Sequence, residues 1–143
     1  MVKMPQEYAL SSGESCEQDE LVALYTSVGW TSYTSDPALL ECAIAGSTYV
    51  VTARKDGELV GLARVISDGA SIAYLQDVLV HPEHRRRGLA SALVAQAFLP
   101  FESVRQKVLL TDAEPGQRAF YESLGLTEIR DLPGDGLRAF VRM

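Results

Sequence analysis

The chain has 143 residues, of which 47% are hydrophobic and 22% charged, and its formal net charge is -6. This length suits one domain with a substantial core, so we expect a single domain over residues 1–143. The acidic balance argues against nucleic acid and against an anionic membrane as the main partner, because both require a basic face. Otherwise the composition is that of an ordinary globular protein.

The two cysteines and the first residues of the chain bear on the compartment. Cys16 and Cys42 lie far apart and lack metal-ligand spacing, so we expect free thiols in a reducing environment and no metal site. The first 20 residues hold no apolar signal segment, and no stretch approaches the ~20 apolar residues of a membrane span. We therefore expect a cytoplasmic protein.

The first part of the chain predicts one strand and two helices. Weak alternation around residues 8–10 predicts a short strand. The apolar spacing at residues 21–25 predicts an amphipathic helix that ends near Gly29. Asp36-Pro37 supplies an N-cap and a favourable first helical residue, which predicts a second helix running to Gly46.

Three β-rich runs follow, at Thr48–Ala53, Leu59–Ser67 and Ser71–Val80. The connections between them contain Asp56-Gly57 and Asp68-Gly69, and Asp-Gly tolerates the positive φ of tight hairpin turns. The three runs therefore predict an antiparallel meander.

The last part of the chain predicts two helices and three strands. The helices are expected at Gly88–Leu99 and Pro115–Leu124, with a buried strand at Lys107–Thr111 between them. Two final strands are expected at Leu126–Arg130 and Gly136–Arg142. The order β-αα-βββ-α-β-α-ββ predicts an α+β fold with a mixed, mostly antiparallel sheet flanked by helices.

The sharpest local feature is the basic turn His84-Arg85-Arg86-Arg87 before Gly88. Positive side chains oppose the helix macrodipole, which carries about +0.5 charge at a helix N-terminus. A bound pyrophosphate would reverse this effect, because the free N–H groups of the first turn would donate to it. Gly88 would allow the backbone to approach closely. The turn predicts a pyrophosphate cradle, and the alternative is a solvated basic turn.

The same turn carries a family resemblance. Arg85-x-x-Gly88-x-Ala90, after a strand ending in Val80-His81-Pro82, resembles the coenzyme A signature Gln/Arg-x-x-Gly-x-Gly/Ala of the GNAT N-acetyltransferase superfamily. The resemblance implies that backbone amides of the turn and first helical turn bind the pyrophosphate of acetyl-CoA, and that the end of the preceding strand pairs with the pantetheine arm. The implied residues are Arg85, Arg86, Arg87, Gly88, Leu89, Ala90 and Ser91 for the pyrophosphate, and Val78, Leu79 and Val80 for the arm.

A second segment, Phe120-Tyr121 followed by Gly125-Leu126, resembles the GNAT helix with Phe-Tyr-x-x-x-Gly-Phe, with Leu126 in place of the last Phe. The resemblance implies that Phe120 and Tyr121 contact the cofactor and that Tyr121 protonates the departing thiolate. A phenol with an ordinary pKa of ~10 stays protonated at neutral pH and can serve as an acid. The alternatives are a core aromatic or a ligand contact without proton transfer.

Direct transfer needs a base, because a lysine-like amine with a pKa of ~10.4 arrives protonated. Strict alternation of the strand places Asp77 between Leu75 and Leu79 on one face. A carboxylate there is costly unless it is paired or functional, so Asp77 is the first candidate base and a structural hydrogen-bonding role is its alternative. Asp112, after the apolar run Val108–Leu110, is the second candidate, with a turn or capping aspartate as its alternative.

One subgroup of the superfamily is especially similar. The runs at residues 28–30, 62–69 and 77–80 resemble plant serotonin N-acetyltransferase-like proteins and their bacterial relatives. This resemblance implies that Asp77, Asp112 and Tyr121 act as a set. The insertion Glu114-Pro115-Gly116 departs from the subgroup and affects the expected geometry of Asp112.

The acceptor side is expected to contain Tyr25, Trp30, Tyr33 and Gln76, with Asp36 and Glu41 nearby. Aromatic and acidic groups suit a cationic arylalkylamine or polyamine, although these aromatics can equally pack the helical layer. Three functions remain open: acetylation of a small-molecule amine, acetylation of a protein lysine or N-terminus, and a CoA-binding regulatory module. By family analogy a homodimer is also plausible.

Overall fold

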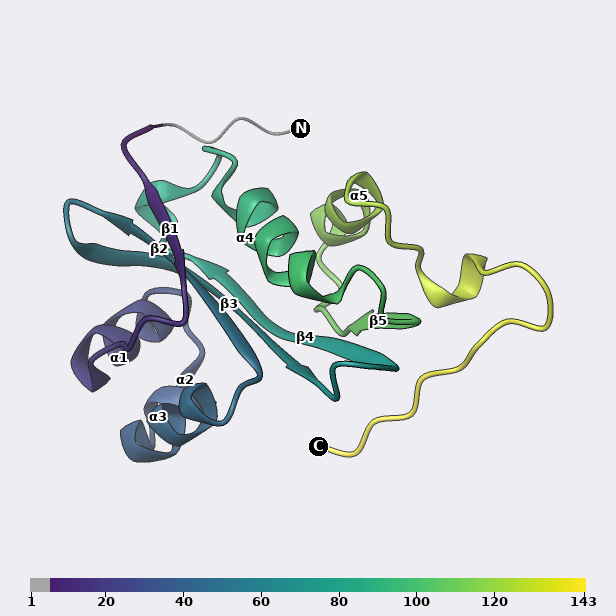
Figure 1. Ribbon diagram of the computed structural model, residues 1–143, viewed down its shortest axis with the longest axis horizontal. Coiled ribbons are helices and arrows are strands. Elements are labelled where there is room, and N and C mark those ends of the chain that lie inside the picture. The colour runs from purple at the N-terminus through teal and green to yellow at the C-terminus, as the bar shows by residue number, and fades with distance from the viewer. Residues whose placement is uncertain (1–5) are drawn as a thin grey trace. The chain divides into compact units, whose positions relative to one another are not determined.

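Five strands form one mixed sheet in the computed structural model, which describes residues 6–143 (Figure 1). The strands lie in the order β1-β2-β3-β4-β5; the first four are antiparallel, and β5 runs parallel to β4. Their bounds are β1 Ala9–Ser12, β2 Tyr49–Lys55, β3 Glu58–Ser67, β4 Ile72–Val80 and β5 Gln106–Leu109. The predicted meander and the mixed sheet are confirmed.

The chain divides into two compact units, the first ending at Leu110 and the second comprising Thr111–Met143. The first unit contains the sheet and the helices α1 Gln18–Ser27, α2 Thr31–Thr34, α3 Pro37–Ala45 and α4 Leu89–Phe98. Asp36 caps α3 as predicted, since its Oδ1 accepts from the Leu39 N–H at 3.1 Å. The short helix α2 was not predicted, because four residues are too few to show a helical period.

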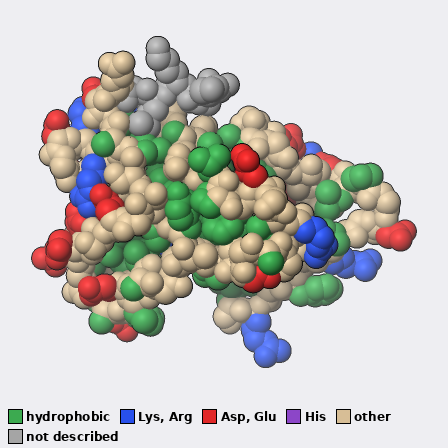
Figure 2. Space-filling model, in the orientation of Figure 1, with side chains coloured by type: hydrophobic (Ala, Val, Ile, Leu, Met, Phe, Trp, Pro, Cys, Tyr) green, Lys and Arg blue, Asp and Glu red, His purple; other side chains and the backbone are tan. Residues whose placement is uncertain are grey.

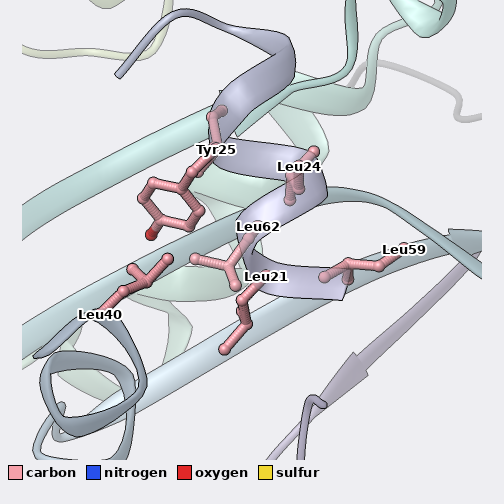
Figure 3. Packing of buried hydrophobic residues seen from close by; sticks show 7 residues of the cluster. Leu21, Leu24, Tyr25, Leu40, Leu59 and Leu62 are labelled. Carbon is pink, nitrogen blue, oxygen red and sulfur yellow. The ribbon is translucent and has the colours of Figure 1, made fainter. Parts of the chain in front are cut away.

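One face of the sheet is covered by the helices α1 and α3. Leu21, Leu24 and Tyr25 of α1 and Leu40 of α3 pack on the sheet in a cluster of fully buried side chains (Figure 3). The strands contribute Leu59, Leu62 and Leu79 to the same cluster. Each such leucine stabilises the fold by about 1.5–3 kcal/mol relative to exposure. This layer positions the acceptor-side aromatics named above.

The opposite face of the sheet is covered by α4, and Gly61 of β3 allows the helix to approach closely. A Cβ atom at Gly61 would lie 3.0 Å from Leu93 Cδ1 of α4 and 3.3 Å from Ala53 Cβ. Neighbouring residues of a strand point to opposite faces, so Gly61 faces α4 while Leu62 faces α1. The helix is therefore seated directly on the backbone of the sheet.

The second unit contains α5 Pro115–Ser123 and a 3₁₀ turn at Ile129–Asp131. Arg118 of α5 holds this turn, since it pairs with Glu122 and Glu128, each at 2.7 Å, and with Asp131. The strands predicted at Leu126–Arg130 and Gly136–Arg142 are wrong, because neither range forms a strand.

The backbone and the exposure of residues 134–141 explain why no strand forms at Gly136–Arg142. Gly134 and Gly136 adopt φ of 79° and 74°, which interrupts an extended backbone. Leu137, Phe140 and Val141 are more than half exposed, so burial of apolar side chains does not stabilise a strand there. The predicted burial of Lys107–Thr111 is also wrong: β5 is half-buried, since it lies at the edge of the sheet.

Charged side chains are interspersed on the face drawn in Figure 2, where Lys and Arg lie among acidic and uncharged side chains. Near β1 and α1, Arg54 pairs with Glu14 at 2.7 Å and with Glu20 at 2.8 Å. Among residues 6–143, no helix combines the length and the apolar character needed to cross a membrane.

Candidate active site

The basic turn connects β4 to α4 through two left-handed residues. After Val80, a 3₁₀ turn spans Pro82–His84, and the backbone then turns at Arg86, with φ of 62°, and at Gly88, with φ of 79°. A positive φ is uncommon for a residue other than glycine and is unfavourable for arginine. The turn is therefore held in a special conformation immediately before the helix.

The first turn of α4 has backbone donors that have no partner among residues 6–143. Ala92 makes the first intrahelical bond, donating its N–H to Gly88 O at 3.1 Å. The N–H groups of Leu89, Ala90 and Ser91 precede that bond, and Gly88 offers no side chain to cap them. Since the helix dipole also favours negative charge here, the residues present fit a pyrophosphate.

Residues around the turn include one group with metal-ligand chemistry. His81, Glu83 and His84 offer ligand atoms within 4.8 Å of one another. Both Nδ1 atoms of the imidazoles already have partners: His81 accepts from the Glu83 N–H at 3.2 Å, and His84 bonds the Tyr8 hydroxyl at 2.8 Å. A metal ion bound through either Nδ1 atom would have to compete with these bonds.

The edge of β4 is open along the part that leads to the turn. Its pairing with β5 ends at Leu75, opposite Leu109, and no other strand among the described residues covers that edge. On the other edge, which faces β3, the His81 N–H donates to Val60 O at 2.8 Å, so His81 and Val60 are a hydrogen-bonded pair of the β3–β4 ladder. Because such pairs alternate along an antiparallel ladder, the backbone groups of Val78 and Val80 point to the open edge, and those of Leu79 point to β3.

A bulge in β4 changes the faces predicted by strict alternation. Arg64 lies opposite Asp77, but the next residue, Val65, lies opposite Leu75, so Gln76 has no partner on β3. Since Arg64 and Val65 point to opposite faces, Asp77 and Leu75 do too. The expected grouping of Asp77 with Leu75 is therefore wrong, and Asp77 faces the α1–α3 layer.

Asp77 is buried, with 3% of its side chain exposed, and each of its oxygens has a partner. Its Oδ2 accepts from Arg64 Nε at 2.5 Å and from the Tyr25 hydroxyl at 2.9 Å. Its Oδ1 accepts from the Tyr33 hydroxyl at 3.0 Å. The carboxylate thus joins β3, α1 and α2 to β4.

The charges in this cluster compensate one another. Burial alone would lower the pKa of the Arg64 guanidinium, but its hydrogen bond and ion pair with Asp77 raise that pKa above its ordinary value. Burial and the Asp77 charge raise the pKa of Tyr25 well above the ordinary range of a phenol. At neutral pH, therefore, Arg64 is charged and Tyr25 is a neutral hydrogen-bond donor to the carboxylate.

Three predicted acceptor residues are close in space within the first unit. Tyr33 and Trp30 have ring centroids 6.2 Å apart, and Gln76 Nε2 donates to the Tyr33 hydroxyl at 3.4 Å. Arg64 Nη2 donates to the same hydroxyl at 3.2 Å, and its guanidinium carbon lies 5.8 Å from the Tyr33 ring centroid. The Tyr33 hydroxyl therefore has hydrogen bonds with Asp77, Arg64 and Gln76, which hold its ring in one position.

The remaining predicted residues lie in the second unit. Phe120 and Tyr121 on α5 are half-buried, with ring centroids 4.9 Å apart. Asp112 is exposed and accepts from the Glu114 N–H at 3.1 Å, which forms a turn before α5. Burial and then the Asp112 charge raise the pKa of Tyr121 above its ordinary value, so this phenol stays protonated at neutral pH.

Arg64 is the residue that sequence reasoning missed in this site, whereas Tyr25 was expected among the acceptor-side aromatics. The signal for Arg64 was present, since an arginine inside the apolar run Leu62–Ile66 needs a buried partner, and Asp77 was the carboxylate of the adjacent run. The hydrogen bond of Tyr25 to Asp77 was not predicted, because a tyrosine on the apolar face of a helix is ordinary core material.

The mixed α+β fold thus combines an open strand edge with a helix N-terminus that follows a basic turn, an arrangement that suits a ligand with a phosphate group and an extended arm. Residues 16–126 match the profile of the acetyltransferase (GNAT) family. The chain therefore belongs to the GNAT family of acetyltransferases, enzymes that use acetyl-CoA.

Individual relatives agree with this assignment. An uncharacterized N-acetyltransferase, ycf52, of Pyropia yezoensis is 29% identical over 126 residues, covering 85% of this chain and 71% of that protein. The structure of a GNAT family acetyltransferase of Streptococcus pneumoniae has a TM-score of 0.79 and 27% identity, covering 95% of this chain and 99% of that one. An aminoglycoside N-acetyltransferase in complex with CoA, 17% identical, shares the fold with a TM-score of 0.71, covering 100% and 98%.

Proposed function

We propose that this protein transfers the acetyl group of acetyl-CoA to the primary amine of a small molecule, by direct attack in a ternary complex. The observation that carries the proposal is the open first turn of α4 behind the left-handed residues Arg86 and Gly88. Backbone donors at a helix N-terminus bind a pyrophosphate without any change in the protein. Arg85, Arg86 and Arg87 add positive charge at the same place.

The open edge of β4 supports a binding site for the pantetheine arm of the cofactor. Val78 and Val80 have backbone donors and acceptors that β5 does not use. An extended amide-containing arm can pair with such an edge as an added strand would. The thioester end would then lie near the bulge at Gln76, beside the acceptor-side aromatics.

Tyr121 is the proposed acid of the reaction. When acetyl-CoA is bound, it supplies an activated acetyl group: a bond forms between the amine nitrogen and the carbonyl carbon, and the carbon–sulfur bond breaks. The Tyr121 hydroxyl donates a proton to the departing thiolate. The attacking amine loses one proton to a carboxylate or to water, so that charge and atoms balance.

The contacts of Asp77 favour its positioning role over its role as base. Both oxygens of Asp77 are already engaged, Oδ2 by Arg64 and Tyr25 and Oδ1 by Tyr33, which leaves neither oxygen directed at an incoming amine. Asp112 is exposed and is near enough to Tyr121 to affect its pKa. Asp112 or a water molecule is therefore the proposed base.

The proposed acceptor is an arylalkylamine-like or polyamine-like cation. Trp30 and the fixed ring of Tyr33 offer aromatic faces that attract an ammonium group. The resemblance of residues 28–30, 62–69 and 77–80 to plant serotonin N-acetyltransferase-like proteins also supports an arylalkylamine. The proposed catalytic unit is the whole of residues 1–143, since the family match at 16–126 spans both compact units.

The test is turnover of acetyl-CoA with a panel of acceptors, followed by release of free thiol. The panel contains arylalkylamines, polyamines, aminoglycosides, and peptides with a free lysine or N-terminus. The proposal expects the highest kcat/KM with a small amine. Preferred turnover of a peptide would favour protein acetylation instead, and CoA binding without turnover of any acceptor would favour the regulatory module.

A further inference from the structure

Two residues before β1 contact both sides of the basic turn. The Tyr8 hydroxyl lies 2.8 Å from His84 Nδ1, although the two residues are 76 positions apart in the chain. The Glu7 carboxylate accepts from Arg87 Nη1 at 3.1 Å. Since Arg85 and Arg86 lie between His84 and Arg87, the two contacts lie at the two ends of the turn.

The sheet fixes the position of these two residues. Ala9 of β1 pairs with Arg54 of β2, and Tyr8 directly precedes Ala9. Lys55, the last residue of β2, lies with Nζ 5.7 Å from the centroid of the Tyr8 ring and 3.9 Å from Glu7. Tyr8 is 4% exposed, so its ring is part of the packed edge and not a free surface side chain.

The turn has a conformation that needs such support. Arg86 has φ of 62°, in the left-handed region that arginine rarely adopts. A turn of this kind keeps its shape only where surrounding contacts hold it. Among the described residues, the part-buried hydrogen bond of His84 to Tyr8 can supply this support, whereas the ion pair of Arg87 with Glu7 is exposed and contributes little to the shape of the turn.

We propose that Tyr8 is a positioning residue for acetyl-CoA and that Glu7 limits the positive charge of the cradle. The inference rests on the proposed function, since it concerns the same pyrophosphate site. Tyr8, through His84, holds the turn in the shape that directs the amides of α4 to the ligand. Glu7 neutralises part of the charge that Arg87 would otherwise offer to a phosphate. The two residues therefore have opposite effects on cofactor affinity.

The first experiment is isothermal titration of Tyr8→Phe with acetyl-CoA. Losing one hydrogen bond should raise Kd about three- to tenfold. The kcat at saturating acetyl-CoA should not change, since Tyr8 acts on binding of the cofactor and not on the reacting atoms. Tyr49→Phe is the matched control, because Tyr49 lies at the far end of β2 from the turn and should keep the wild-type Kd.

A double-mutant cycle separates positioning from a general loss of stability. His84→Ala removes the same hydrogen bond from the other side, and Tyr8→Phe combined with His84→Ala should bind no more weakly than the weaker single variant. Additive losses in the double variant would overturn the proposed role of the bond. If Tyr8→Phe did not fold, an unchanged Kd of His84→Ala would overturn it as well.

The second experiment concerns Glu7→Gln, which frees Arg87 of its partner. Acetyl-CoA should bind about two- to threefold more tightly at low salt, and the gain should disappear at high salt because exposed charges are screened. Glu102→Gln is the control, since Glu102 is exposed and follows the far end of α4. Weaker binding by Glu7→Gln would overturn the charge-limiting role.

These outcomes are distinct from a failure of the proposed function. If folded wild-type protein did not bind acetyl-CoA or CoA, the cradle itself would be wrong. If the wild type bound and the Kd of Tyr8→Phe equalled that of Tyr49→Phe, the cradle would stand and the positioning role of Tyr8 would be rejected.

Discussion

Arg64 of β3 and Asp77 of β4 form a buried ion pair directly across the ladder, with Nε and Oδ2 2.5 Å apart. The pair lies beside the bulge that turns Asp77 toward the helical layer. Through Tyr25 and Tyr33 it also connects that layer to the strand whose open edge is proposed to bind the cofactor. The ion pair would therefore couple the proposed acceptor side of the molecule to the proposed cofactor side.

Removing one partner of this pair should strongly destabilise the protein. Asp77→Asn leaves the Arg64 charge buried without a counterion, so we expect a loss of about 3–5 kcal/mol in the free energy of unfolding. Arg64→Met combined with Asp77→Leu should lose clearly less than the sum of the two single variants. Urea unfolding of the wild type, Arg64→Met, Asp77→Leu and the double variant measures this coupling energy, and additive losses in the double variant would contradict it.

The same variant distinguishes the two roles of Asp77 in catalysis. If Asp77 positions Tyr33, the activity lost in Asp77→Asn should not return at higher pH. If Asp77 were the base, raising the pH would restore the rate, because solvent would then deprotonate the amine. A profile of kcat/KM between pH 7 and pH 10, on protein shown to be folded, decides between them.

Gly88→Asp should raise the Kd for acetyl-CoA at least tenfold. Aspartate at this left-handed position brings a side chain and a negative charge against the proposed pyrophosphate site. Gly69→Asp is a matched control, since Gly69 also has a positive φ, 74°, but lies at the opposite end of β4. Equal affinities of the two variants, measured by calorimetry, would remove the cradle assignment.

Tyr121→Phe should lower kcat while leaving the affinity for acetyl-CoA nearly unchanged. The phenol is proposed to act only as the thiolate departs, so its loss affects the transition state and not cofactor binding. Because its pKa is raised, wild-type activity should not decline through deprotonation of Tyr121 below the ordinary phenol pKa of ~10. A normal kcat in the variant would exclude Tyr121 as the acid.

Glu20 should make stability depend on pH in the acid range. Its hydrogen bond to Arg54 lowers the pKa of Glu20 below its usual value of 4.5 in the folded protein. The resulting stabilisation is present above the unfolded pKa and is lost as the pH falls through the folded pKa. Glu20→Gln should therefore lower Tm at pH 7 and much less at pH 3. If Tm fell equally at both pH values, the ion pair would not be the cause.

Much of the first unit could be predicted because its signals are local. The capped helix at Asp36, the two Asp-Gly turns and the alternation of the three central strands each depend on neighbouring residues only. The function of the basic turn could also be predicted from neighbouring residues, since positive charges that oppose the helix dipole indicate a bound anion at the same turn.

The features that were not predicted depend on distant residues or on pairing. The bulge at Gln76 is a property of the β3–β4 register, and strict alternation therefore assigned Leu75 to the wrong face. The Tyr8–His84 bond joins residues 76 positions apart, with no pattern in the sequence to relate them. The tail at Gly136–Arg142 has the alternation of a strand, but alternation alone does not supply a neighbouring strand to pair with.

The absent side chain at Gly61 sets the height of α4 above the sheet. Even an added methyl group would lie 3.0 Å from Leu93 Cδ1, so the Leu93 side chain would have to shift, and a larger side chain would displace the helix outward. The first turn of that helix is the proposed phosphate site, so the displacement would also move the amides that are to bind the ligand. A substitution at this buried position would thus reduce cofactor affinity together with folding stability, although Gly61 itself touches no part of the cofactor site.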